Sequence, residues 1–298
     1  MKQVLVIGST VADVIIHVDR LPATGEDIHV KRQTISLGGC AYNVSDMLRL
    51  FQIPYILFSP VGTGTYGYFV REALAERGIQ SPIPAPEQEN GCCYCFVEAS
   101  GERTFVCHRG AEYRFHPEWF HQLDSDSIDS VYLCGLEMEE PTGIHILRYL
   151  EQHPGFQIYF APGPRIRLLQ PPILESVFAL SPILHLNERE ALEYTGRDTV
   201  EEAAHTLHQK TRNTVIVTLG PRGAYYQTTG ASALIPGTKA EQKDTIGAGD
   251  SHIGAVIARL KQGASMETAL TDANRIAAAV VETAGALLSE ETFRKLEF

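Results

Sequence analysis

The sequence predicts an α/β fold with a mostly parallel central sheet, helices on both faces and a small additional β-sheet. From about residue 116 onward, short apolar runs alternate with helical stretches, which is typical of a parallel sheet. Two β segments, at about 11–35 and 91–108, do not fit this alternation. A chain of 298 residues is long enough for one large domain. We therefore expect 1–298 to form a single α/β domain into which these two segments are inserted as a small sheet.

The first half of the chain begins with a strand. Residues 3–8 (QVLVIG) are a short apolar run ended by glycine, typical of a strand buried on both faces. In 40–51, Val44, Met47, Leu48 and Phe51 share one helical face. The other elements expected here are strands at 11–18, 28–35 and 55–61, a helix at 68–78, and a hairpin from 92–99 and 103–108.

The second half alternates more regularly. The proline-rich stretches 81–89 and 161–172 are interpreted as connections. Near Asp250 a helix begins, because apolar residues recur at i, i+3, i+4 and i+7 from Ile253 to Leu260. The remaining elements are expected as strands at 131–136, 156–161, 183–186 and 214–220, and as helices at 142–152, 188–195 and 200–210.

Charge and cysteine content exclude several function classes. The chain has 36 Asp+Glu against 25 Lys+Arg, a net charge of −11 that repels nucleic-acid backbones and anionic lipid. The N-terminal apolar run holds Asp13 and lacks a cleavage-site pattern, and no run approaches the ~20 residues of a membrane span. The six cysteines show no C-x-x-C spacing, so we expect reduced thiols and a cytoplasmic protein. Cys92, Cys93 and Cys95 are interpreted as packing or interface residues rather than metal ligands.

The strongest chemical signal is DTIGAGDSHIGAVIARL, residues 244–260. Gly247, Ala248 and Gly249 precede an amphipathic helix, so their amides lie at a helix N-terminus and can bind an anion. Asp250 stands in the first turn of the same helix. Amides for a phosphoryl group beside a carboxylate are what phosphoryl transfer needs. The alternative is that Asp250 only caps a glycine-rich loop.

A second glycine-rich entry to a helix lies at 36–44, SLGGCAYNV. Gly38 and Gly39 permit a close approach, and Asn43 offers a donor and an acceptor to a ligand rich in hydroxyls. Taken alone, this segment is equally typical of a tight turn between a strand and a helix.

Together the two segments resemble the ribokinase-like (PfkB-type) family of carbohydrate and nucleoside kinases. GGCAYN and DTIGAGD are similar to its two signatures, in the same order and at a similar separation. NERE at 187–190 resembles the family's N-x-x-E motif, and TLGPRG at 218–223 its T-x-G-x-x-G nucleotide loop. The resemblance covers essentially the whole chain. It implies ATP- and Mg²⁺-dependent phosphorylation of a hydroxyl on a small sugar or nucleoside.

The resemblance also implies a role for each matching residue. Asp250 would take the proton from the substrate hydroxyl, and a modest rise in its pKa beside the triphosphate would help. Gly247, Ala248 and Gly249 would form the anion hole, and Asn187 and Glu190 would hold Mg²⁺ through water. ATP would be bound by Thr218, Gly220, Gly223 and Asn274, and the sugar by Asp13, Gly38, Gly39, Asn43, Glu137 and Arg165. The backbone around Asp244 and Ile246 would hold a monovalent cation such as K⁺.

The sequence departs from the family pattern mostly on the sugar side. Cys40 stands where ribokinases have Lys, Tyr42 is bulkier than the usual small residue, and Ala161 replaces an Asp found in many relatives. Ile246 replaces the usual Thr of the second signature. The chemistry therefore carries over, while ribose, fructose, a deoxy-sugar acid and a nucleoside all remain open as substrates.

Two rival functions are also open. Residues Gly62–Gly67 read G-x-G-x-x-G between a strand and a helix, as in dinucleotide-dependent oxidoreductases, although three prolines stand where the second strand should follow. A catalytically silent sugar-binding protein on the same fold is the other, and the intact DTIGAGD segment argues against it. The small sheet is expected to act as a lid over the sugar, and its exposed edge favours a homodimer.

Overall fold

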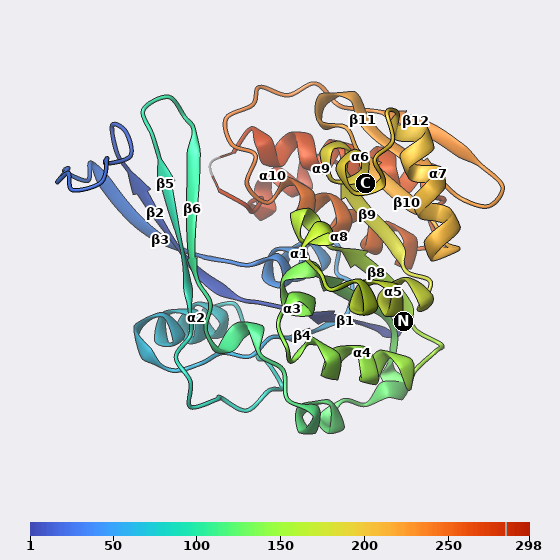
Figure 1. Ribbon diagram of the computed structural model, residues 1–298, viewed down its shortest axis with the longest axis horizontal. Helices are drawn as coiled ribbons and strands as arrows, with labels where there is room; N and C mark the ends of the chain where they lie inside the picture. Colours follow the sequence, from blue (N-terminus) through green and yellow to red (C-terminus); the bar gives the residue numbers. More distant parts are fainter. Residues whose placement is uncertain (284) are drawn as a thin grey trace.

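The computed structural model describes residues 1–283 and 285–298. Its larger sheet has eight strands in the order β12-β11-β10-β9-β8-β7-β1-β4 (Figure 1). From β4 to β10 all neighbours are parallel, whereas β11 is antiparallel to both β10 and β12. The strands are β1 (Gln3–Ile7), β4 (Tyr55–Phe58), β7 (Ile128–Cys134), β8 (Gln157–Ala161), β9 (Ile183–Asn187), β10 (Val215–Thr218), β11 (Gly223–Gln227) and β12 (Ser232–Pro236).

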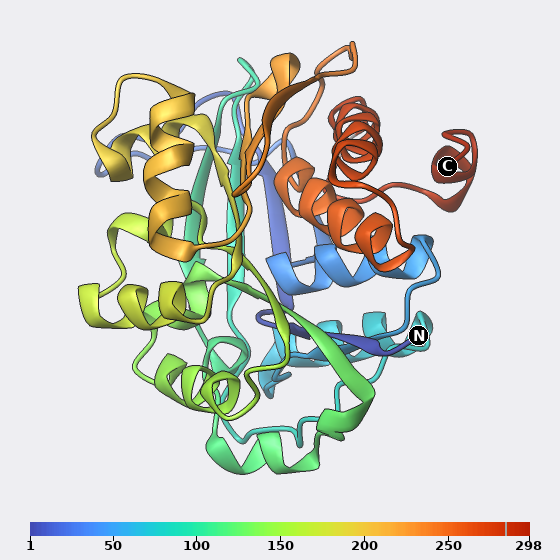
Figure 2. The ribbon, with the colours of Figure 1, turned by 90° about the vertical axis from the view of Figure 1, so that its right-hand side faces the viewer.

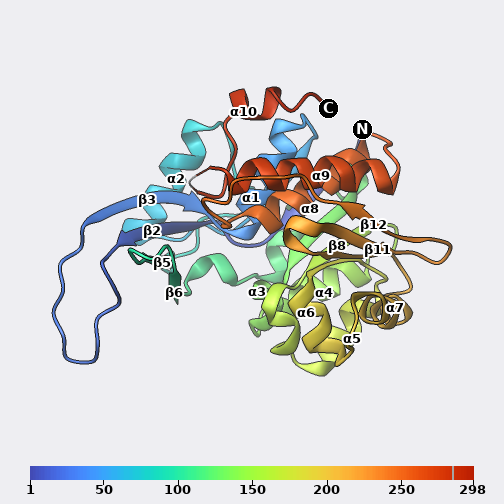
Figure 3. The ribbon, with the colours of Figure 1, turned by 90° about the horizontal axis from the view of Figure 1, so that it is seen from above.

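Helices cover both faces of this sheet, as Figure 3 shows from above. Alternate strand residues enter two separate cores: Val4 and Val6 face the side of α1, α8 and α9, and Leu5 and Ile7 face the opposite side. This two-sided burial explains why the strands read as continuous apolar runs. The helices are α1 (Cys40–Leu50), α2 (Gly64–Glu76), α3 (Gly135–Glu139), α4 (Gly143–Glu151), α5 (Pro171–Ala179), α6 (Glu188–Thr195), α7 (Val200–Thr211), α8 (Ala248–Lys261), α9 (Met266–Val281) and α10 (Glu290–Arg294).

Helices α1 and α8, about 200 residues apart in the sequence, pack against each other. Figure 2 shows the blue α1 lying alongside the orange-red α8. Each helix follows one of the two glycine-rich motifs, so this packing brings the two motifs to one place. Short 3₁₀ turns complete the chain at Ala111–Tyr113, Pro117–Gln122, Ser125–Ser127, Gly163–Arg167 and Gly220–Arg222.

A second, four-stranded sheet stands beside the larger one, in the order β3-β2-β5-β6 (Figure 1). β2 pairs with β5 in parallel, and the outer strands β3 and β6 pair antiparallel. Asp13 of β2, Cys93 of β5 and Cys107 of β6 are register partners, so their side chains lie in one row on the same face. The strands are β2 (Val11–His17), β3 (Arg32–Gly38), β5 (Cys92–Val97) and β6 (Arg103–His108).

The predicted α/β fold with a mostly parallel sheet and a small second sheet is confirmed, with local differences. The strand expected at 28–35 lies at Arg32–Gly38, because β3 pairs with β2 from His17↔Arg32 to Val11↔Gly38. The stretch 161–172, interpreted as a connection, contains the start of α5, where proline at the first helical position needs no N–H partner. The elements β11, β12, α9 and α10 lay outside the predictions.

In the part of the chain that the structure describes, no helix is both long and apolar enough to cross a membrane. The cytoplasmic location stays a prediction.

Candidate active site

The DTIGAGD segment forms an open helix N-terminus. Gly247 caps α8 with φ of +74°, a left-handed conformation that favours glycine, and a Cβ there would lie 2.5 Å from the Ala286 Cβ. A Cβ on Gly249, by contrast, would have nothing within 4 Å. The first-turn amides of a helix have no partner within the helix. The Ala248 N–H donates to the Thr245 carbonyl at 3.4 Å, so the remaining first-turn N–H groups and the helix dipole are what this turn offers to an anion, with free space beside Gly249.

Asp250 stands in this first turn and is partly buried. Its Oδ2 accepts a hydrogen bond of 2.8 Å from the Asn43 amide on α1. Burial raises the pKa of Asp250 to about 6, against the opposing effect of the Asn43 bond. The upward direction agrees with the sequence prediction, but the cause differs, because the protein itself desolvates the carboxylate.

Asp13 lies close to this carboxylate from the small sheet. A Cβ on Gly38 would stand 1.9 Å from Asp13 Oδ2, so only glycine leaves room for the carboxylate; Gly39, with φ of +102°, lets the chain turn into α1. Burial raises the pKa of Asp13 to about 7, and the charges of Cys107 and Asp250 add to this. The structure thus brings together two carboxylates with raised pKa values, Asp13 from the small sheet and Asp250 from the second motif.

Asn43 supplies a third polar group at this point. While its amide nitrogen donates to Asp250, its Oδ1 is buried and has no hydrogen-bond partner among the described residues. A buried, unpaired acceptor is costly unless a ligand completes it. Asp13, Asn43 and Asp250 together offer acceptors for several hydroxyl groups.

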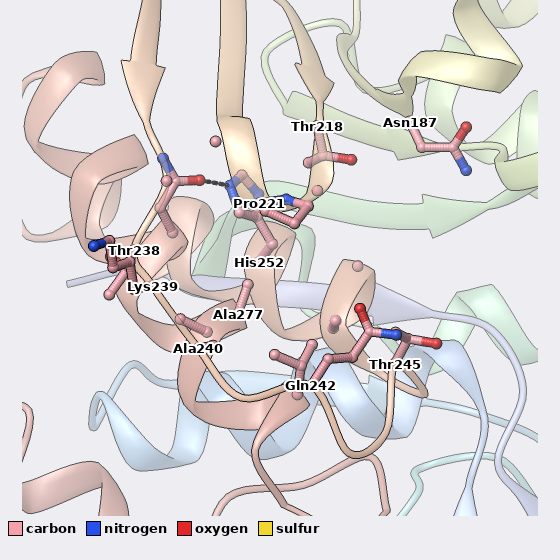
Figure 4. A pocket seen from close by; sticks show the side chains of 18 residues that line it. Asn187, Thr218, Pro221, Thr238, Lys239, Ala240, Gln242, Thr245, His252 and Ala277 are labelled. Carbon is pink, nitrogen blue, oxygen red and sulfur yellow. Dashed lines mark hydrogen bonds between the residues drawn. The ribbon is translucent and has the colours of Figure 1, made fainter. Parts of the chain in front are cut away.

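On the other side of α8 lies a cavity of about 570 Å³ (Figure 4). It brings together all the residues that the resemblance placed around ATP with the first turn of α8. These are Asn187, Thr218, Gly220, Gly223, Asn274, Ala248 and Gly249. Sequence reasoning missed the segment around 237–242, whose Thr238, Lys239, Ala240 and Gln242 also line the cavity, as does Thr245 of the second signature itself. The missed segment precedes the second signature but follows no helix or strand period.

His252 lines the cavity. A chain of hydrogen bonds holds its ring in place, and Figure 4 marks one of them. The Asn274 amide donates to the carbonyls of Ile235 and Pro236, so its Oδ1 accepts from His252 Nε2 at 3.2 Å. His252 Nδ1 in turn accepts from His185 Nε2 at 3.0 Å. Burial lowers the pKa of His252 to about 4, so the ring is neutral at pH 7. His252 is therefore a buried, uncharged side chain.

Asn187 and Glu190 form a closed pair at the start of α6. Asn187 Oδ1 accepts from the Glu190 N–H at 2.8 Å, and Glu190 accepts from both the N–H and the side-chain amide of Asn187. Burial raises the pKa of Glu190. Asn187 lines the cavity, and Glu190 stands directly behind it.

Asp244 is buried and multiply bonded. Its carboxylate accepts from the Ile246 N–H at 2.9 Å and the Gly285 N–H at 2.8 Å. Arg103 of β6 forms an ion pair with it at 2.8 Å. This pair joins the small sheet to the glycine-rich loop, and nothing in the sequence pattern pointed to Arg103.

Two of the predicted sugar ligands already have protein partners. Glu137 is fully buried, where it accepts from the Ser9 N–H at 2.7 Å and the Cys134 thiol at 2.7 Å. Arg165 forms an ion pair with Glu139 at 3.3 Å. Both still act on the cluster, because the charge of Glu137 raises the pKa of Asp250 and that of Arg165 lowers the pKa of Cys107. Their role toward the sugar stays a prediction.

The G-x-G-x-x-G turn at Gly62–Gly67 is filled by the chain itself. Thr63 exchanges backbone hydrogen bonds with Gln88 and Asn90, and a Cβ on Gly62 would stand 2.3 Å from the Gln88 carbonyl. Within the stretch 81–89, only Glu89 forms an isolated bridge, to Thr63, and no strand runs there. The N–H groups of Gly62 and Thr63 are therefore already bonded, and the second strand of a dinucleotide site is missing from 81–89.

The cysteines of β5 form no metal site with their surroundings: among the described residues there is no group of three or more metal-binding side chains. Cys92 and Cys95 are buried, and Cys93 lies beside Cys107 of β6.

Fold and site together define a class of protein: an α/β phosphotransferase with an anion-binding helix N-terminus between a nucleotide-sized cavity and a cluster of hydroxyl acceptors. The chain belongs to the pfkB family of carbohydrate kinases, which it matches over residues 1–292. It is accordingly an enzyme that transfers a phosphoryl group to an alcohol.

Individual relatives agree with this membership. The chain is 33% identical to the uncharacterized sugar kinase YegV of Escherichia coli strain K12, over 94% of this chain and 88% of that protein. The ribokinase of Thermotoga maritima has the same fold, with a TM-score of 0.85, 21% identity and 99% of both chains covered. An Escherichia coli chain solved in complex with ATP and Mg²⁺ superposes with a TM-score of 0.81 and 21% identity over 99% of both chains. The ribokinase-like fold is thus confirmed.

Proposed function

We propose that this kinase transfers the terminal phosphoryl group of ATP to a hydroxyl of a small sugar or nucleoside, with Asp250 as the general base. The observation that carries the proposal is the position of Asp250. Its carboxylate stands in the open first turn of α8, which also lines the cavity, and is bonded to Asn43 beside Asp13. A base at the boundary between an anion site and a set of hydroxyl acceptors can deprotonate an alcohol that faces the phosphoryl group.

Binding and chemistry divide between the two sides of α8. The substrate hydroxyls bond to the Asp13 carboxylate and to the free Asn43 Oδ1, which places one hydroxyl against Asp250. Asp250 takes the proton as the oxygen attacks, and a pKa of about 6 leaves it largely ionised at pH 7 yet basic enough to accept it. The amides of Gly247, Ala248 and Gly249 stabilise the charge that develops on the phosphoryl oxygens.

The residues around Asn187 fit a magnesium ion. A carboxylate and an amide oxygen are the hard donors that Mg²⁺ prefers, and burial leaves the Glu190 carboxylate short of solvation that a cation would restore. Asn187 and Glu190 would hold the ion through water, since their direct hydrogen bonds already join them to each other. The ion would neutralise phosphate charge.

The backbone around Asp244 and Ile246, expected to hold a monovalent cation, lies beside the Arg103 guanidinium, which is ion-paired with the Asp244 carboxylate and already supplies a positive charge there. We expect kcat/KM to change less than about twofold when K⁺ is replaced by tetramethylammonium at constant ionic strength, since the Arg103 charge stays in place. Activation of tenfold or more by K⁺ would contradict this role of Arg103.

We also propose that the small sheet closes over the sugar as a lid and that a second copy of the chain packs against it. Its edge strands β3 and β6 expose Ile35, Phe105 and Val106. Apolar side chains on unpaired strand edges favour association with another sheet. Light scattering of the wild type and of Val106→Lys tests this: the wild type should be dimeric and the variant monomeric, and a monomeric wild type would refute it.

The decisive experiment is an ADP-release screen over pentoses, hexoses, sugar acids and nucleosides, with equilibrium binding measured in parallel. Turnover with at least one compound, lost in Asp250→Asn, supports the proposal. Binding of a sugar without ADP release from any compound would favour a silent sugar-binding protein instead.

A further inference from the structure

We propose that Cys93 and Cys107 form a dithiol that hydrogen peroxide converts into a cross-strand disulfide beside the sugar side of the site. Their Sγ atoms are 3.4 Å apart, and they occupy directly opposite positions on the antiparallel strands β5 and β6. Opposite residues of an antiparallel pair have Cα atoms about 4.5–5.5 Å apart, which lies within the range that disulfides span. The bond needs only that the sulfurs approach by about 1.4 Å through side-chain rotation.

The surroundings make the two sulfurs unequal, as such a reaction requires. Cys107 is exposed, and Cys93 is half-buried beside it. In the neutral pair the Cys107 S–H donates to Cys93 Sγ, and once Cys107 is ionised the Cys93 S–H donates to its thiolate. This hydrogen bond, together with the nearby Arg165 and Arg109 guanidinium groups, lowers the pKa of the Cys107 thiol to about 6, and the pKa of Cys93 is correspondingly raised. At neutral pH an accessible thiolate therefore lies next to a protonated thiol.

The reaction balances without a further reactant. The Cys107 thiolate attacks one oxygen of hydrogen peroxide, the O–O bond breaks, and the products are a Cys107 sulfenic acid and hydroxide, which is protonated to water. The Cys93 sulfur then attacks the Cys107 sulfur, the S–S bond forms, and hydroxide leaves with the Cys93 proton as a second water. Two thiols are oxidised and one peroxide is reduced to two waters.

The position of the Cys93–Cys107 pair couples its charge to Asp13, one of the proposed sugar ligands. Asp13 is the register partner of Cys93 and lies in the same row as Cys107. The groups that face Asp13 are Cys93 from β5, Cys107 from β6, Gly38 from β3 and Asp250 from α8. The charge of the Cys107 thiolate raises the pKa of Asp13 more than the charge of Asp250 does. Disulfide formation removes that charge, so Asp13 ionises at a lower pH.

The cross-link is tested on the full-length protein with dilute hydrogen peroxide, followed by alkylation and peptide mapping. We expect a Cys93–Cys107 disulfide as the main product, reversible by dithiothreitol, at doses that leave the buried Cys134 reduced. Cys93→Ser and Cys107→Ser should abolish it. Cys95→Ser is the matched control. Cys95 lies on the same strand and the same face as Cys93, but its cross-strand partner is Phe105, so this variant should keep the disulfide. Separate oxidation of the two sulfurs, with no cross-link, would overturn the proposal.

The effect of the disulfide on catalysis rests on the proposed function and is measured separately, as the pH profile of kcat/KM. In the oxidised wild type the acid limb of kcat/KM for the sugar should move to lower pH, which raises kcat/KM at pH 6 by about threefold. At pH 8 the two forms should agree, and the KM for ATP should stay the same. Identical pH profiles would refute the coupling to Asp13, whereas absence of any turnover would refute the proposed function and leave the cross-link result standing.

Discussion

The nucleotide side and the sugar side of this site are built in opposite ways. Around the cavity the polar side chains already satisfy one another: Asn274 bonds to His252 and to two carbonyls, and Asn187 bonds to Glu190. On the sugar side, Asn43 Oδ1 has no partner among the described residues, and Asp13 and Asp250 are held with raised pKa values. In the proposed function, the first side is therefore already complete when ATP binds, and the second is completed only by the hydroxyls of the substrate.

The largest effect is expected for Asp250→Asn. The variant keeps the size and the polar character of the side chain but cannot accept a proton, so kcat should fall by about a thousandfold. The affinity for ATP should stay within about twofold, because the cavity does not depend on the charge of Asp250. The measurements are steady-state turnover and equilibrium ATP binding, with the exposed Asp198→Asn as control. Near-normal kcat would remove Asp250 from the mechanism.

The next largest effect is expected for Asp13→Asn. Losing charged hydrogen bonds to the substrate should raise the KM for the sugar by about 10- to 100-fold and leave the KM for ATP unchanged. Since burial opposes ionisation of Asp13, the neutral variant should be at least as stable as the wild type at pH 8. Kinetics and thermal unfolding measure the two effects, with Asp19→Asn as the exposed control. A parallel loss of ATP affinity would mean that the two sides are not separate.

The pH dependence sharpens the same comparison. Both Asp250, with a pKa of about 6, and Asp13, with a pKa of about 7, must be ionised to act, so kcat/KM for the sugar should fall by up to tenfold per pH unit between about pH 7 and 6 and by up to a hundredfold per unit below about pH 6. The contribution of these two carboxyls to stability should run the other way. Asp13 and Asp250 bind more protons in the folded state than in the unfolded chain between pH 4 and 7, so their contribution to the free energy of unfolding should decrease as pH rises through that range, whereas the buried His185 and His252 contribute with the opposite sign. Asp13→Asn should flatten this decrease, and an unchanged slope would contradict the assignment.

The sequence predicted the framework better than the sugar side, for physical reasons. Strand periods, glycine turns and helix starts are local, so the strand β1, the helix α8 and the cap at Asn187 could be predicted from neighbouring residues. The Arg103–Asp244 and Cys93–Cys107 contacts join segments that no local period relates, and they depend on how the small sheet stands beside the larger one. Glu137 was expected among the sugar ligands, but its burial beneath Ser9 is a property of packing that its position in the chain does not reveal.

The smallest expected effect lies on the nucleotide side, at His252. In His252→Asn a polar group stays near the position of Nδ1, but the N–H that donates to Asn274 Oδ1 is lost. In His252→Gln the longer side chain can place its amide N–H where Nε2 was. One lost hydrogen bond of about 1 kcal/mol should raise the KM for ATP by about fivefold in His252→Asn and little in His252→Gln. The KM for the sugar should be unchanged in both variants, because His252 contacts the cavity wall and not the Asp13 side. If both variants weakened ATP binding equally, packing of the imidazole rather than its hydrogen bond to Asn274 would hold this wall in place.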